Sequence, residues 1–240
     1  MLRFFFFLLL FLLTIYLILA YQYRNVYKLN YFFGKKGAGK SLLMVSYMLK
    51  YMKKGYTIYS DIPGLNIKGV RQISAKDLEK FVPSSNSVLF LDEVGISFDN
   101  RKYSTFSDGH RNFFKFQRKY KVIVYMNSQS FDVDKKIRDL IDRFYLIQSF
   151  GNVICLCRPI NRKVALVEAS SQGESRVADN LKFAPFWEWK WIFMPKYFKY
   201  FDSFDAPERP ILPYVEVEKG ISIKRDKDIL SKIKKGIKIK

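Results

Sequence analysis

The most hydrophobic stretch of the chain lies near its start and contains no charged residue. It runs from Phe4 to Tyr21, eighteen residues in all, and as a helix it would span roughly 27 Å, close to the roughly 30 Å of a bilayer's hydrocarbon core. A cleaved signal peptide or a buried core helix has a similar pattern, but no Ala-x-Ala cleavage site follows this run. The pattern therefore predicts an uncleaved transmembrane anchor.

Charges that flank this run predict how the anchor is oriented. Only Arg3 precedes it, whereas four basic residues follow it closely, namely Arg24, Lys28, Lys35 and Lys36. The positive-inside rule places the more basic flank in the cytoplasm. We therefore expect a single-pass protein of the cytoplasmic membrane, with the bulk of the chain in the cytoplasm.

After the anchor, short apolar runs alternate with segments of helical spacing. Strands are expected at 29–33, 56–62, 87–94, 121–130 and 144–150, helices at 42–52, 74–81, 110–120 and 132–143, and a hairpin at 151–169 with its turn at Asn161-Arg162. Several of the strands are continuous apolar runs, which is typical of a parallel sheet covered on both faces. The expected fold class is therefore α/β.

Toward its end the chain changes in character. Five of the eight prolines fall in the last 56 residues, among clustered aromatic residues, so we interpret 170–214 as a poorly regular extension. Residues 219–240 carry nine Lys or Arg against two Asp. This pattern favours a basic tail that binds DNA or anionic lipid, although a merely solvated tail has the same composition.

Composition narrows the possible chemistry. The chain has 42 Lys or Arg against 22 Asp or Glu, for a net charge of +20, which suggests phosphate, nucleic acid or an anionic membrane as a partner. AT-rich coding would also produce an excess of Lys. A single histidine, His110, excludes His-based metal catalysis, and the closely spaced Cys155 and Cys157 exclude a disulfide scaffold and argue against a zinc site.

A glycine-rich segment between the first expected strand and the helix that follows carries a specific motif. Gly34 to Ser41 reads GKKGAGKS and matches G-x-x-x-x-G-K-[ST] at every fixed position. The glycines let backbone N–H groups point at phosphates, Lys40 reaches the β- and γ-phosphates, and the Ser41 hydroxyl ligates Mg²⁺. The predicted cofactors are ATP and Mg²⁺, and the predicted nucleotide-binding residues are Gly34, Lys35, Lys36, Gly37, Ala38, Gly39, Lys40, Ser41 and Leu42.

Two acids follow a buried apolar strand further along the chain. Asp92 is placed to hold Mg²⁺ together with Ser41, and Glu93 is placed to activate the attacking water as a general base. Because a kinase that transfers phosphate to a bound hydroxyl needs no such base, the pair favours hydrolysis. At the end of the 121–130 strand, which should lie beside the Asp92 strand, Gln129 or Asn127 could orient the water; a polar turn without function is the alternative.

The combination resembles the zonular occludens toxin (Zot)-like family of filamentous-phage morphogenesis ATPases, which are related to the FtsK/HerA group of DNA-pumping motors. The resemblance covers roughly residues 29–150 and is carried by GKKGAGKS (34–41), LDEVGISFDNR (91–101), FFKFQRKY (113–120) and VIVYMNSQSFDVDKKIRDLIDRFYLI (122–147). It implies a RecA-like P-loop fold, membrane attachment, self-assembly, and ATP-driven extrusion of single-stranded phage DNA as coat protein is added. The family's catalytic residues correspond to Gly34, Gly39, Lys40, Ser41, Asp92, Glu93 and Gln129.

One feature departs from the family. Members commonly place the membrane helix after the ATPase domain and follow it with an external domain, whereas here the anchor comes first. No later run is long and uncharged enough to span a bilayer. The sequence therefore gives no evidence for an external domain, and the toxin activity associated with that domain is not carried over.

The sequence thus predicts a P-loop NTPase of the RecA/FtsK-like type, an α/β fold with a parallel sheet, helices on both faces and one N-terminal transmembrane helix. The expected parts are an anchor at 1–23, a P-loop ATPase domain at 24–170, and an extension with a basic tail at 171–240. Expected partners are further copies of the chain, the host inner membrane, phage coat or assembly proteins, and single-stranded DNA. Because such motors take an arginine from a neighbouring subunit, we expect Arg118 to be catalytic in trans, with Arg138 and Arg143 as further candidates.

Two other functions fit the same motifs. A DNA-transfer motor of a plasmid or conjugative element would have the same cradle and acids. A membrane scaffold that binds ATP without appreciable turnover would keep the cradle, although Glu93 argues against it.

Overall fold

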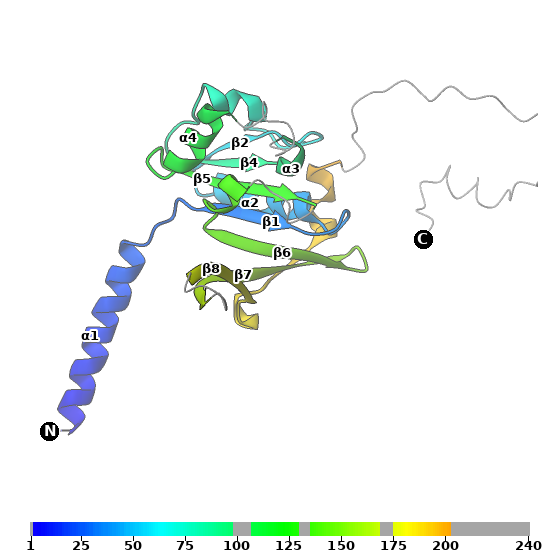
Figure 1. The fold of residues 1–240 in the computed structure, drawn as a ribbon. Helices are drawn as coiled ribbons and strands as arrows, with labels where there is room; N and C mark the ends of the chain where they lie inside the picture. The colour runs from blue at the N-terminus through cyan, green and yellow to red at the C-terminus, as the bar shows by residue number, and fades with distance from the viewer. Residues whose placement is uncertain (1, 98–106, 130–134, 169–174, 203–240) are drawn as a thin grey trace, which may run out of the picture. The chain divides into compact units, whose positions relative to one another are not determined.

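The computed structural model describes residues 2–97, 107–129, 135–168 and 175–202 (Figure 1). Contacts divide the chain into a large unit, Met1–Asp205, and a smaller one, Ala206–Lys240. The basic tail predicted at 219–240 belongs to the smaller unit and lies outside the described residues.

The chain starts with helix α1 (Leu2–Gln22). From Arg3 to Gln22 its side chains are not buried in the protein, and among the described residues it is the one helix long and apolar enough to cross a membrane. Phenylalanine and leucine cover it on all sides, as expected of a helix whose surroundings are apolar.

A nine-stranded sheet forms the centre of the domain. Its strands are β1 (Leu29–Phe33), β2 (Thr57–Ser60), β3 (Val70–Gln72), β4 (Ser87–Leu91), β5 (Val122–Ser128), β6 (Arg143–Phe150), β7 (Ile154–Glu168), β8 (Ser175–Phe183) and β9 (Lys190–Phe193). The order is β3-β2-β4-β5-β1-β6-β7-β8, with β9 paired to β7. The first six strands of this spatial order, from β3 at one edge to β6, pair in parallel. Strands β7, β8 and β9 add antiparallel pairs.

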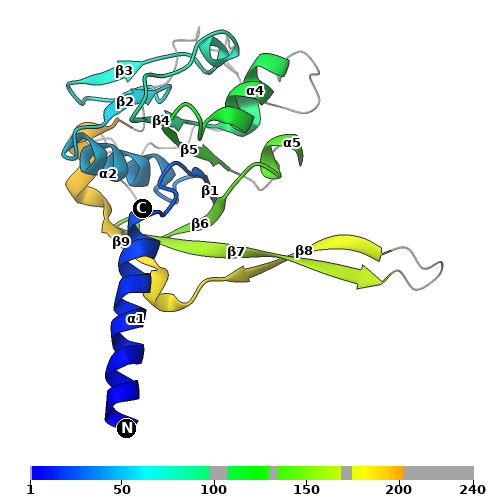
Figure 2. The same cartoon turned by 90° about the vertical axis from the view of Figure 1, so that its left-hand side faces the viewer.

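Helices lie on both faces of the parallel part (Figure 2). The sheet separates two clusters of buried side chains, and neighbouring residues of β1 show the alternation, since Tyr31 belongs to one cluster and Phe32 to the other. One cluster is covered by α2 (Lys40–Met52) and η3 (Met194–Tyr200), and the other by η1 (Ala75–Glu79), α4 (Asp108–Phe116) and α5 (Lys135–Arg138). The short elements α3 (Val94–Ser97) and η2 (Phe186–Glu188) complete the described helices. The predicted α/β P-loop fold is confirmed.

The central strands have the order that the site requires. Strand β1 pairs with β5, and β5 pairs with β4, all in parallel. The carboxyl ends of these three strands therefore meet at one edge of the sheet. The prediction that the Asp92 strand and the 121–130 strand lie side by side is confirmed.

The predicted hairpin at 151–169 is wrong. Residues Ile154–Glu168 form one continuous strand, and Asn161-Arg162, expected to be its turn, pairs with residues of β8. A two-residue hairpin turn of this kind favours glycine after the asparagine, and Arg162 stands there instead; pairing with β8 keeps both residues extended. The sequence between β7 and β8, 169–174, lies outside the described residues.

The interpretation of 170–214 as poorly regular is also wrong where the chain is described. Strands β8 and β9 extend the sheet past residue 170, and η3 packs on α2.

Two of the predicted helices differ from the structure in length or in type. The segment predicted at 74–81 is the 3₁₀ helix η1, which begins with a capping box formed by Ser74 and Asp77. The segment predicted at 132–143 is described only as α5.

Candidate active site

The glycine-rich segment forms the loop between β1 and α2 (Figure 1). Gly34 is required by a close contact with backbone, and Gly39 by its backbone conformation. A Cβ on Gly34 would lie 2.3 Å from the Ile147 carbonyl oxygen, and a Cβ on Gly39 would lie 2.6 Å from the Met194 sulfur. Gly39 also has φ +88°, a left-handed conformation that suits glycine, and precedes the first turn of α2. The loop is thus held between strand β6 and η3, and its backbone is set by packing.

Lys40 is the first residue of α2, and its buried side chain reaches back to the loop. Its Nζ donates to the carbonyl oxygens of Gly34, at 2.9 Å, and Lys35, at 3.2 Å. Burial lowers its pKa, while Glu93 and Asp92 act in the opposite direction. The ammonium is therefore positioned by the loop itself and faces the two acids.

Asp92 follows β4 and lies beside the start of α2. The Ser41 hydroxyl donates to its Oδ2 over 3.4 Å. These two oxygens fit Mg²⁺, which binds to proteins through one or two carboxylates together with phosphate oxygens. No group of three His, Cys, Asp or Glu suited to a metal occurs among the described residues, so Ser41, Asp92 and a nucleotide's phosphates would have to supply the ligands.

Glu93 has an unusual backbone that its neighbours hold in place. Its φ is +44°, a conformation that is uncommon outside glycine and tends to occur at functional sites. Its N–H donates to the Asp92 Oδ1 and to the Asn127 Oδ1, each at 2.9 Å. Its carboxylate Oε1 accepts from the Gln129 Nε2 at 3.0 Å. Gln129 and Asn127, which the sequence left as alternatives, thus contact different parts of one residue.

The sequence analysis missed Asp61. This acid follows β2, and its Oδ1 accepts the Asp92 N–H at 2.6 Å. Burial raises its pKa to about 7, with the Asp92 N–H acting in the opposite direction. Its position directly after β2 places it at the same edge of the sheet as Asp92, but β2 reads TIYS and is not the continuous apolar run that singled out Asp92.

The arginines expected to act in trans lie elsewhere. Arg118 is exposed in the turn before β5, at the amino ends of the parallel strands, whereas the loop lies at their carboxyl ends. Arg143 begins β6 at the same amino edge, and Arg138 ends α5. The structure therefore brings Lys40, Ser41, Asp92, Glu93 and Gln129 together and places none of the three arginines with them in the same subunit.

Comparison with known proteins gives one family and several structural neighbours. The family model described as zonular occludens toxin (Zot) matches residues 28–153. The N-terminal domain of zonular occludens toxin from Neisseria meningitidis is 15% identical, covers 73% of this chain and 99% of that chain, and has a TM-score of 0.49. The genome packaging NTPase B204 of Sulfolobus turreted icosahedral virus 2, in complex with sulfate, is 14% identical over 53% of this chain and 77% of that chain, with a TM-score of 0.42.

A third neighbour is the flagellar accessory protein FlaH from Methanocaldococcus jannaschii, 13% identical over 65% of this chain and 90% of that chain, with a TM-score of 0.41. No curated protein sequence matches the chain.

The matched region starts just before β1 and ends just after β6, so it contains the glycine-rich loop, the two acids and Gln129. It covers more than half of the 240 residues, and the family expected from the sequence is confirmed. The chain belongs to the zonular occludens toxin (Zot) family.

Proposed function

We propose that the chain is a membrane-anchored, Mg²⁺-dependent ATPase. The observation that carries this proposal is the meeting of five side chains at the carboxyl edge of the sheet, namely Lys40, Ser41, Asp92, Glu93 and Gln129. Phosphoryl transfer to water needs a glycine-rich backbone and a buried lysine to hold the phosphates. It also needs a hydroxyl–carboxylate pair for the metal ion and an adjacent carboxylate for the attacking water.

Each residue has a distinct task in this proposal. Lys40 exchanges the loop carbonyls for phosphate oxygens of the bound nucleotide. Ser41 and Asp92 hold Mg²⁺, which neutralises charge on the phosphate oxygens when it is bound. Glu93 accepts the proton of the attacking water, and Gln129 fixes the orientation of that carboxylate by donating to Oε1.

Nucleotide binding can be tested at Lys40. Lys40→Ala should abolish ATP binding and hydrolysis, because it removes the one buried cation of the loop. The matched control is Lys53→Ala, an exposed lysine just after α2, which should bind and hydrolyse ATP as the unaltered protein does. Equilibrium binding of a fluorescent ATP analogue and phosphate release are the measurements. ATP binding by Lys40→Ala at the unaltered affinity would contradict the assignment.

We further propose that this ATPase drives the assembly and extrusion of filamentous phage with single-stranded DNA. Family membership and a helix able to cross a membrane support the proposal. The proposed location is the host cytoplasmic membrane with the ATPase domain in the cytoplasm, and the proposed partners are further subunits, coat or assembly proteins and single-stranded DNA. A DNA-transfer motor of a plasmid or conjugative element is the alternative with the same active site.

Phage extrusion and DNA transfer differ in the process that stops when ATP is not hydrolysed. In a cell that carries the phage genome, Glu93→Gln should stop virion release while single-stranded DNA and coat protein accumulate inside. A DNA-transfer motor would instead lose delivery of DNA to recipient cells. Virion titre and transfer frequency, measured on the same variant, decide between them.

A further inference from the structure

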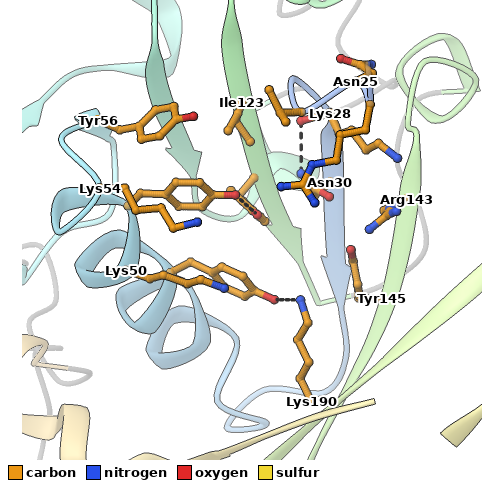
Figure 3. A pocket seen from close by; sticks show the side chains of 15 residues that line it. Asn25, Lys28, Asn30, Lys50, Lys54, Tyr56, Ile123, Arg143, Tyr145 and Lys190 are labelled. Carbon is orange, nitrogen blue, oxygen red and sulfur yellow. Dashed lines mark hydrogen bonds between the residues drawn. The ribbon is translucent and has the colours of Figure 1, made fainter. Parts of the chain in front are cut away.

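A cavity of about 300 Å³ lies at the amino ends of the parallel strands, at the opposite edge of the sheet from the glycine-rich loop (Figure 3). Its walls come from the segment between α1 and β1, from β1, β5, β6 and β9, and from the end of α2 with the residues that lead to β2. Five basic side chains approach this space from several elements, namely those of Lys28, Lys50, Lys54, Arg143 and Lys190. The cavity is therefore built by segments far apart in the sequence.

The lining of the cavity is basic and aromatic. It contains no Asp or Glu, but six basic residues, Arg24, Lys28, Lys50, Lys54, Arg143 and Lys190, and five tyrosines, Tyr47, Tyr51, Tyr56, Tyr125 and Tyr145. None of these six cations forms an ion pair within the described part of the chain. The nearest acids that act on them, Asp142 and Glu188, are not part of the lining.

For two of the lysines, the nearby acids do not compensate for burial and neighbouring cations. Burial lowers the pKa of Lys28, and the neighbouring Arg143 lowers it further, while Asp142 acts in the opposite direction. Burial also lowers the pKa of Lys190, whose Nζ donates to the neutral Tyr47 hydroxyl at 2.6 Å. An anion in the cavity would offset both effects, and tyrosine hydroxyls and lysines are suitable donors to phosphate oxygens.

The position of the cavity in the chain indicates where the anion comes from. Helix α1 ends at Gln22, and Arg24 of the lining follows two residues later, at most about 7 Å away along the backbone. Near Lys190, the side chains of Phe186 and Trp187 are each 72% exposed. Exposed Trp and basic residues beside a transmembrane helix are typical of the lipid headgroup region.

A nucleic acid fits this cavity less well. Base recognition by tyrosine needs a free ring face, whereas Tyr125 is buried and stacks on Tyr47 at 5.0 Å and on Phe90 at 5.2 Å. The stacked rings of Tyr47 and Tyr125 are thus not free to stack on a base, and the cations and hydroxyl groups of the lining suit a compact phosphate group.

We propose that this cavity binds the phosphate of an anionic phospholipid headgroup and so fixes the domain against the membrane surface. The inference rests on the membrane attachment proposed above. It assigns the edge of the sheet next to α1 to lipid and leaves the opposite edge to nucleotide.

The test uses the full chain in a neutral detergent and short-chain lipids as probes. Phosphatidylglycerol should raise the midpoint of thermal unfolding, because a ligand of the native state stabilises it, and phosphatidylcholine at the same concentration should not. The double variant Lys50→Gln/Lys54→Gln should bind phosphatidylglycerol at least roughly tenfold more weakly, since the loss of even one charge-assisted hydrogen bond of this kind costs about that factor. The matched control, Lys53→Gln/Lys68→Gln, loses the same charge from two exposed lysines outside the lining and should keep the affinity.

Three results would overturn the proposal. The first is that phosphatidylglycerol does not raise the midpoint of thermal unfolding, and the second is that both double variants lose affinity for phosphatidylglycerol equally. The third is that inorganic phosphate or an oligo-thymidine raises the midpoint as much as phosphatidylglycerol does, and that this rise disappears in Lys50→Gln/Lys54→Gln. Insertion of the chain into pure phosphatidylcholine vesicles, measured by carbonate extraction, tests the membrane attachment separately. A chain that inserts without preferring phosphatidylglycerol contradicts only the lipid site, and a chain that fails to insert contradicts the attachment on which it rests.

Discussion

At the scale of single residues, the proposed activation of water depends on how Glu93 is held. A non-glycine residue at positive φ costs on the order of 1–3 kcal/mol, and here two side-chain oxygens accept its N–H while Gln129 donates to its carboxylate. Asn127 is fully buried on β5 and faces the carboxyl edge of the sheet. We interpret Asn127 as a positioning residue that acts through Glu93.

Asn127→Ala tests this role. The loss of one buried hydrogen bond costs about 1–3 kcal/mol, and since that bond fixes Glu93 rather than the nucleotide, kcat should fall roughly tenfold with little change in KM for ATP. The control is Asn86→Ala, which removes a hydrogen-bonded asparagine before β4, at the other edge of the sheet. Steady-state ATPase kinetics on both variants are the measurement, and a rise in KM with normal kcat in Asn127→Ala would contradict the positioning role.

At the scale of elements, the sequence predicted the parallel part of the sheet well and the antiparallel part poorly. Strands β4 and β5 contain buried apolar runs followed by polar residues, and β1 leads directly into the glycine-rich motif, so both their existence and the edge where Lys40, Asp92 and Gln129 meet could be inferred. Asp61 lacked this signal, because it follows a strand whose residues are only alternately buried.

The remaining differences arise because pairing is decided by contacts distant in the sequence. The turn expected at Asn161-Arg162 is overridden by the pairing of β7 with β6 on one side and β8 on the other. Strand β9 and η3 follow prolines and aromatic residues that resemble an irregular segment, yet Met194 of η3 contacts the glycine-rich loop at Gly39. No local pattern identifies such a contact.

Met194→Ala should therefore weaken both the fold and the site. Met194 is buried against Gly39 and Cys155, and truncation of a buried methionine costs about 2–5 kcal/mol. Because the loop would lose its support from η3, ATP affinity should fall several-fold. In contrast, Met52→Ala, at the far end of α2, should lower stability and leave ATP affinity unchanged. The free energy of unfolding and the ATP dissociation constant, measured on both variants, distinguish an effect on the fold from an effect on the site. Equal ATP affinity of all three proteins would show that η3 does not support the loop.

At the scale of the whole molecule, only six residues, 23–28, join α1 to β1. If α1 spans the membrane, the ATPase domain is tethered close to it, and subunits of an oligomer must gather their anchors in the same area. Arg118, exposed at the amino edge, stays a prediction for the arginine that a neighbouring subunit supplies.

A longer tether tests whether this closeness matters. About twenty flexible residues inserted between Tyr23 and Arg24 should leave ATP hydrolysis intact, because its chemistry is local to the glycine-rich loop, while virion release falls. Virion titre and phosphate release are compared at equal amounts of membrane-bound protein. A normal titre would show that the anchor only localises the enzyme.

The central claim is that Glu93 activates water for ATP hydrolysis at a site formed by Lys40, Ser41 and Asp92. The most direct measurement compares phosphate release and ATP binding by the unaltered chain and by Glu93→Gln, with Mg²⁺ and after its removal by chelation. Turnover by the unaltered chain should require Mg²⁺, and Glu93→Gln should keep ATP affinity and lose turnover by a factor of at least roughly 100, the lower range for a general base. Hydrolysis by Glu93→Gln at the unaltered rate would contradict the account.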